Sequence, residues 1–106
     1  MALQYFHNQG NLRKRKIIAL ADAYHGDTFG AMSLGAPSAF NAPFQAMLFE
    51  VEFIPSPMDP EACLKALEEK LQNPNVAAFM VEPIQGEAGV VIPSPGYLKK
   101  AAKLCK

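Results

Sequence analysis

Two short polar segments carry most of the residue types that could do chemistry in this chain. The first, AYHGDTFGAMS at residues 23–33, places an aromatic ring, an imidazole and a glycine side by side at Tyr24, His25 and Gly26. A tyrosine ring can stack on a planar ligand, a histidine titrates near neutral pH, and glycine lets the backbone pass close to a ligand. Spacing alone favours a simpler interpretation, with a core aromatic, a surface histidine and an ordinary turn.

The second polar segment, at residues 82–87, follows a run of six apolar residues. A carboxylate at the tip of a buried strand, such as Glu82, needs a hydrogen-bond donor or a shifted pKa. Glu82 and Glu87 are close enough in sequence for an acid–base pair, although helix capping or salt bridges are the commoner roles of two acids in one turn. No phosphate-binding glycine loop, Ser-His-Asp set or metal-ligand spacing is present.

Apolar strands and amphipathic helices alternate around these segments. We predict strands over 16–20, 50–54 and 76–81. Four helices are predicted. The first ends near residue 8, and the second covers 28–35 with Asp27 or Thr28 as its cap. The third runs from Asp59 to the break at 73–75, and the fourth runs from Ser94 or Pro95 to Lys106. Residues 36–48 are predicted to be an irregular loop. This alternation indicates an α/β fold with a parallel sheet, whose strands bind ligands at their carboxyl ends.

Composition limits the class of protein. A chain of 106 residues holds one small domain, and we expect a single partial domain over 1–106, because both terminal helices lack a cap and look truncated. Hydrophobic residues make up 50% of the chain and the net charge is zero, which favours a globular protein and gives no sign of a nucleic-acid or membrane partner. The lack of a membrane-length apolar run or signal peptide predicts a cytoplasmic location. Cys63 and Cys105 are predicted to be buried thiols rather than metal ligands.

AYHGDTFGAMS and NVAAFMVEPIQGEAGVV resemble motifs of the class III, or omega, aminotransferases, which use pyridoxal phosphate (PLP). The resemblance covers essentially the whole chain and continues through Pro93 and the Pro-Gly-Tyr-Leu run at 95–98. It implies an incomplete part of the large domain of the fold-type I PLP-dependent transferase fold, a three-layer α/β/α arrangement with a mostly parallel sheet. The N-terminal half is most similar to the diaminopelargonate (adenosylmethionine-8-amino-7-oxononanoate) aminotransferase branch of biotin synthesis, and the C-terminal half to the ornithine branch. Whether one gene or two joined paralogues underlies this stays open.

The resemblance also implies roles for individual residues. Tyr24 would stack on the pyridine ring of PLP, while His25 and Gly26 would shape the pocket wall. Glu82 would hydrogen-bond near the cofactor, and Glu87 would pair with an arginine to gate substrate binding.

The family's phosphate-binding turn, pyridinium aspartate, Schiff-base lysine and carboxylate-binding arginine have no match in this chain. We therefore expect no catalytic residue, no metal site and no activity of the chain on its own. The complete enzyme would be a homodimer that moves an amino group from an amine or amino-acid donor to a carbonyl acceptor. A non-catalytic remnant or interaction module is the alternative.

Overall fold

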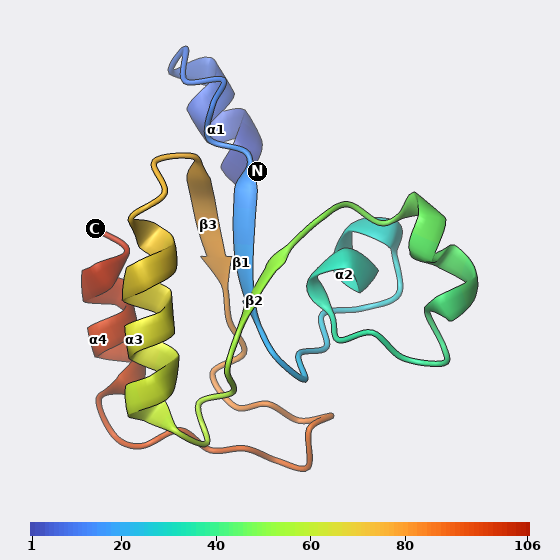
Figure 1. Cartoon of the computed structure of the whole chain (residues 1–106), viewed down its shortest axis with the longest axis vertical. Helices are drawn as coiled ribbons and strands as arrows, with labels where there is room; N and C mark the ends of the chain where they lie inside the picture. The colour runs from blue at the N-terminus through green and yellow to red at the C-terminus, as the bar shows by residue number, and fades with distance from the viewer.

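The computed structural model describes all 106 residues and contains one parallel three-stranded sheet. Its strands are β1 (Lys16–Leu20), β2 (Glu52–Ile54) and β3 (Val76–Met80), in the order β2-β1-β3. Ala19 on the central strand is registered with Phe53 on one side and Met80 on the other. All three carboxyl ends therefore point to one edge of the sheet, at the bottom of Figure 1.

The helices flank this sheet. They are α1 (Ala2–Asn8), α2 (Phe29–Leu34), the 3-10 helix η1 (Ala42–Met47), α3 (Pro60–Leu71) and α4 (Tyr97–Leu104). Helices α3 and α4 lie side by side on one side of the strands, and α2 and η1 lie on the other (Figure 1). The predicted α/β class is confirmed. No helix has both the length and the apolar character that crossing a bilayer requires.

Two of the helix starts follow from their capping residues. The Thr28 hydroxyl accepts a hydrogen bond from the Ala31 amide at the start of α2, which decides between the two predicted caps. The Asp59 carboxylate accepts from the Ala62 amide at 3.1 Å, and Pro60 occupies the first turn of α3. Each cap satisfies an amide that the helix itself leaves without a partner.

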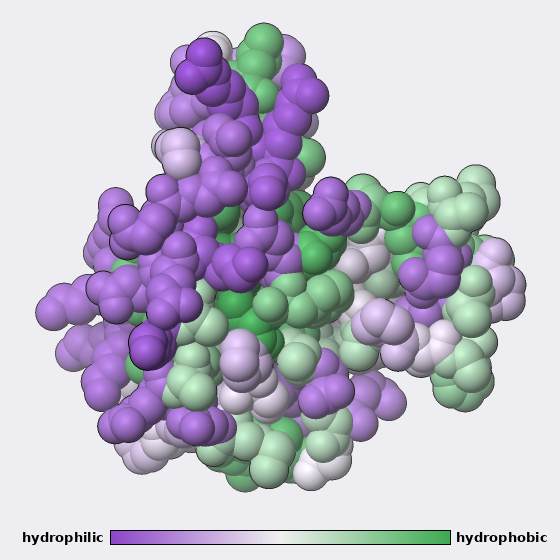
Figure 2. Space-filling view, viewed as in Figure 1, coloured by the Kyte–Doolittle hydropathy of each residue, from purple (hydrophilic) through white to green (hydrophobic).

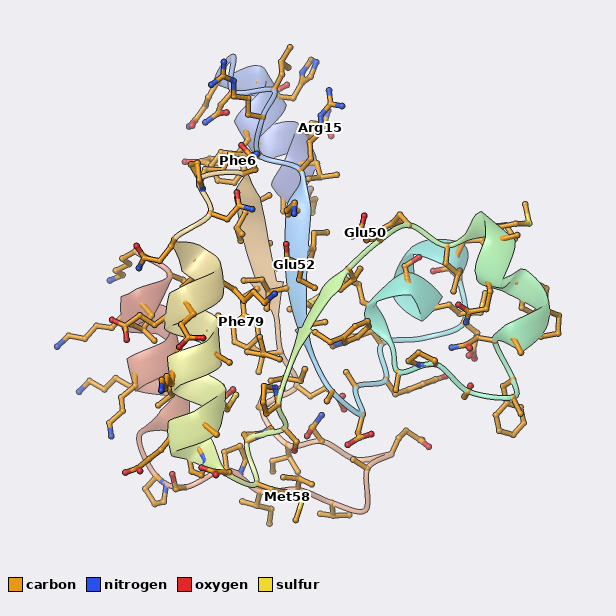
Figure 3. The ribbon with its side chains drawn as sticks, in the orientation of Figure 1. Phe6, Arg15, Glu50, Glu52, Met58 and Phe79 are labelled. Atoms are coloured by element: carbon orange, nitrogen blue, oxygen red, sulfur yellow. The ribbon has the colours of Figure 1, made fainter.

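The core lies between the sheet and the α3–α4 pair. It consists of Ile18, Leu20, Ala23, Ile54, Cys63, Leu67, Val76, Tyr97 and Ala101. Phe79 packs against this cluster and points toward α3 in Figure 3. The Tyr97 hydroxyl lies 3.2 Å from the Cys63 sulfur, and burial raises the pKa of both groups, so both stay protonated at neutral pH.

The opposite face of the sheet is less covered. Phe53 and Met80 share a row with Ala19 on this face, and both are more than a third exposed. Apolar surface is visible over the strands and the lower loops, between the polar α1 and the polar α3–α4 side (Figure 2). The two faces of the sheet therefore differ: one holds the core and the other presents apolar side chains to solvent.

The structure corrects several element boundaries. The second strand begins at Glu52 rather than at residue 50, because its pairing with β1 starts at Ile18 and Glu50 is exposed. At the start of β2, the Glu52 carboxylate forms salt bridges with Lys16 at 2.8 Å and with Lys70 at 3.0 Å.

The predicted irregular loop over 36–48 contains η1, whose first turn holds Pro43, a residue with a backbone already set for helix. The last helix begins at Tyr97 rather than at Ser94 or Pro95. Gly96 has a φ of +84°, a left-handed conformation that an α-helix cannot include. The helix ends at Leu104, so Cys105 is exposed and the prediction that it is buried was wrong, whereas Cys63 is buried as predicted.

Candidate functional site

A cavity of about 700 Å³ opens where the loops after β1 and β3 meet. It is lined by Asp22, Ala23, Tyr24, Gly26, Asp27, Met32, Gly35, Ala36, Ser38, Phe40, Asn41, Glu87 and Ala88. Both polar segments contribute to this lining, as expected from parallel strands that end at one edge of a sheet. The loop between α2 and η1 supplies a third wall that sequence reasoning did not predict.

Tyr24 lines this cavity and is 44% exposed. Its hydroxyl donates a 2.9 Å hydrogen bond to the Asp27 carboxylate. That bond, together with the carboxylate charge, raises the pKa of the phenol, so Tyr24 is neutral at physiological pH. The hydroxyl is held at the edge of the ring, and the flat face remains available. From the sequence, Asp27 was predicted only as a possible helix cap. Its hydrogen bond with Tyr24 was not predicted, because it depends on the conformation of the turn between the two residues.

Glu82 accepts hydrogen bonds from two backbone amides, as we expected for a carboxylate that directly follows a buried strand. One carboxylate oxygen accepts from the Tyr24 amide at 2.9 Å, and the other accepts from the Gly86 amide at 3.4 Å. Glu82 itself does not line the cavity. Its side chain therefore joins the β1 and β3 loops and fixes the backbone from which the Tyr24 ring projects.

Glu87 lies on the cavity wall and is exposed. It forms neither a salt bridge nor a hydrogen bond, and Glu82 donates nothing to it. The two acids therefore do not form the acid–base pair that their spacing allowed. Glu87 is instead free to bind a group that enters the cavity.

His25 and Gly26 complete the first polar segment. The Nε2 atom of His25 is buried and has no hydrogen-bond partner in the chain, and His25 does not line the cavity. Gly26 lines the cavity with a φ of +129°, and a Cβ at this position would lie 3.2 Å from the Ala31 Cβ. A larger residue at 26 would therefore be strained, which explains the glycine.

Asn41 shapes the unpredicted third wall. Its side-chain oxygen accepts from the Ser38 amide and from the Gln45 side chain, both at 2.9 Å, and its side-chain nitrogen donates to the Ala36 carbonyl at 3.0 Å. Asparagine often orders loops by such local bonds, but its partners depend on the loop path. An asparagine at position 41 is typical of a turn, but the sequence spacing around it did not predict that this loop would line a cavity.

The cavity suits an aromatic ring better than a phosphate. Tyr24 offers an aromatic ring for stacking, and Gly26 allows a ligand to approach the backbone closely. His25 is outside this lining, so its unpartnered nitrogen gives no information about what the cavity holds. The charged lining residues Asp22, Asp27 and Glu87 are all acidic, and none of the ten lysine and arginine residues lines the cavity. These residues therefore fit the pyridine ring of PLP, whereas its phosphate would need cations or amides from other residues. No group of three or more His, Cys, Asp or Glu side chains is placed to hold a metal ion.

The parallel strands, with a cavity at their carboxyl ends, give the chain the architecture of an α/β domain, in which ligands commonly bind at this edge of the sheet. Residues 1–106 match the family model of the class-III aminotransferases. The chain therefore belongs to the class III aminotransferase family, and the resemblance carried by its two motifs is confirmed.

Three relatives show how the match is distributed. The chain is 45% identical to the adenosylmethionine-8-amino-7-oxononanoate aminotransferase of Synechococcus elongatus, a match that covers 96% of the chain and 26% of the relative. It is 42% identical to the mitochondrial ornithine aminotransferase of Drosophila melanogaster, which covers 95% of the chain and 22% of that relative. A PLP-bound amine transaminase from an uncultivated Pseudomonas species superposes with a TM-score of 0.86 at 26% identity, over 98% of this chain and 27% of that one. The predicted fold is confirmed, and the chain spans about a quarter of the length of the curated relatives it matches.

Proposed function

We propose that residues 1–106 form part of the PLP-binding large domain of a class III transaminase, which moves an amino group from an amine or amino-acid donor to a carbonyl acceptor. The observation that carries this proposal is the exposed Tyr24 ring in a cavity at the carboxyl ends of the sheet, in a chain of this family. When bound, PLP supplies the electron sink that such a reaction requires.

The chain's own residues would bind and orient the cofactor ring. Tyr24 stacks on the ring, with its hydroxyl held by Asp27 and its backbone held by Glu82. Gly26 forms the adjoining wall, whereas His25, which was expected to share this role, does not line the cavity. Glu87 gates the donor, which its unpaired carboxylate at the cavity wall supports.

The substrates we propose are those that the Synechococcus relative's name states, with adenosylmethionine as amino donor and 8-amino-7-oxononanoate as acceptor, a step of biotin synthesis. The 45% identity supports this choice. Ornithine as donor is the second candidate because the Drosophila relative is nearly as similar, at 42%. The acidic cavity lining suits the cationic amino group of either donor.

We also propose that the complete enzyme is a cytoplasmic homodimer. Phe40, Met58 and Ile92 are each at least 70% exposed, so the chain offers apolar side chains that a second subunit could cover. Met58 lies at the lower edge of the molecule in Figure 3. Both cysteines are free thiols, which fits a reducing compartment.

A pair of grafted enzymes tests the proposed function. Residues 1–106 replace the matching segment in the Synechococcus aminotransferase and, separately, in the Drosophila ornithine aminotransferase. We expect both grafts to bind PLP, and we expect the Synechococcus graft to keep the larger share of its parent's kcat/KM. A folded graft that binds no PLP would contradict the proposed large-domain role. If the Drosophila graft kept the larger share of its parent's kcat/KM, the result would favour ornithine as the donor.

Replacing Glu82 tests the link between the two loops. In the Synechococcus graft, Glu82→Ala removes the carboxylate that accepts hydrogen bonds from the Tyr24 and Gly86 amides. We expect PLP affinity to fall about tenfold, because that is the net contribution of about one hydrogen bond to a charged group. Glu82→Gln keeps one acceptor oxygen and should lose less. Glu50→Ala is the matched control, because Glu50 is exposed and lies outside the cavity. Cofactor absorbance titrations measure all three variants, and equal affinities for Glu82→Ala and Glu50→Ala would disprove the link.

A further inference from the structure

Gln85 is a fully buried polar side chain at the edge where the strands end, with 0% exposure. Its Nε2 atom donates to the Ala21 carbonyl at 2.9 Å, and its Oε1 atom accepts from the Ser56 hydroxyl at 2.8 Å. Ala21 directly follows β1, Ser56 lies just beyond β2, and Gln85 lies in the loop after β3. One amide group thus connects the carboxyl ends of all three strands.

The backbone of Gln85 closes the loop that carries Glu87. The Gln85 amide donates to the Val91 carbonyl at 3.0 Å, and the Val91 amide donates back at 2.9 Å, an isolated antiparallel bridge. Within the enclosed loop, Val90 has a φ of +59°, which a β-branched residue rarely adopts. The loop is therefore tightly constrained, and its orientation depends on how the Gln85–Val91 bridge at its base is held in place.

The side chain of Gln85 fixes that base to the segment that carries Tyr24. Ala21 lies three residues before Tyr24, and Glu82 already binds the Tyr24 amide from the same loop as Gln85. An apolar side chain of similar size would fill the same space without linking the loops. Buried polar groups with satisfied hydrogen bonds specify one geometry, at the cost of desolvating the amide.

We propose that Gln85 is a positioning residue that sets the placement of Glu87 relative to Tyr24 across the cavity. Gln85 does not line the cavity, so it acts through the two loops and touches no ligand. The effect of Gln85 on catalysis rests on the proposed function. Its effect on the placement of the two loops does not depend on a cofactor.

Hydrogen exchange on the full 106-residue chain tests the placement without PLP. Gln85→Leu removes both side-chain bonds, and we expect amides in 21–27 and 85–91 to exchange about tenfold faster, with α3 and α4 unchanged. Ser56→Ala removes one partner only and should give a smaller increase in the same segments. Gln72→Leu is the matched control, because Gln72 is an exposed glutamine at the end of α3.

Two results would overturn the proposal. Exchange that rises equally in α3 and α4 would show that Gln85 supports the core in general. Unchanged exchange in both loops would show that its bonds position nothing. If Gln85→Leu does not fold, Ser56→Ala decides by the same criterion, since it leaves the buried amide in place.

The Synechococcus graft then tests the catalytic consequence through a double-mutant cycle with Glu87→Gln. We expect Gln85→Leu to raise the donor KM about tenfold, with a smaller change in kcat. Glu87→Gln should raise KM in the parent graft and add little in the Gln85→Leu background, because a displaced Glu87 no longer meets the donor. Additive effects would contradict the proposal. A parent graft without transaminase activity would contradict the proposed function alone, and the exchange result would still stand.

Discussion

The 106-residue chain on its own should transfer no amino group to any carbonyl acceptor, although it holds the cavity and Tyr24. PLP-dependent transamination uses a lysine amine that bonds to the cofactor and carries protons during the reaction. None of the ten lysine and arginine residues lines the cavity. Lys99, Lys100, Lys103 and Lys106 are all exposed.

The measurement is amino transfer by the purified chain with PLP, with adenosylmethionine or ornithine as donor. PLP catalyses slow amino transfer without protein, so a reaction with PLP alone sets the background. Turnover clearly above that background would show that a group of this chain replaces the lysine. The Synechococcus graft serves as the positive control, since the same 106 residues are then accompanied by the host's lysine.

The order of elements could be predicted from the sequence because each depends on local chemistry. The apolar run at 16–20 has the composition of a buried strand, and it is β1 with the predicted bounds. Asp59 and Pro60 are a start signal that acts within four residues, and α3 begins there. The strand predicted at 50–54 was wrong at its first two residues. Pairing with β1 begins only at Glu52, although β1 itself starts at Lys16, and the local sequence does not show where pairing between two strands begins.

The site could be predicted in outline for a topological reason. Parallel strands end at one edge, so the segments at Tyr24 and Glu87 had to lie near each other, and both line the cavity. The sequence also required a donor for Glu82 but could not name it, and the donors are the Tyr24 and Gly86 amides. The bonds of Asn41 and Gln85 were not predicted, because their partners are set by loop paths that no periodicity encodes.

Replacing Tyr24 tests the proposed stacking contact, and Tyr24→Ala should have the largest effect on PLP affinity among the cavity variants. In the Synechococcus graft we expect a loss of about 10- to 100-fold, because the substitution removes an aromatic pairing and the ring's apolar contact area. Tyr24→Phe keeps the flat face and loses only the hydroxyl bond to Asp27. Since Asp27 is exposed and solvent can replace that bond, the loss for Tyr24→Phe should be less than about fivefold.

His25→Ala separates a stacking role for Tyr24 from a general effect of disturbing the loop. His25 is next to Tyr24 but does not line the cavity, so His25→Ala should cost less PLP affinity than Tyr24→Ala. A larger loss for His25→Ala would identify the unpartnered Nε2 nitrogen as the more important contact or as a proton carrier. Titrating the cofactor absorbance across the three variants gives the affinities. If Tyr24→Ala binds PLP as tightly as the parent graft, the ring only packs against the protein, and the cofactor must be held by residues other than Tyr24.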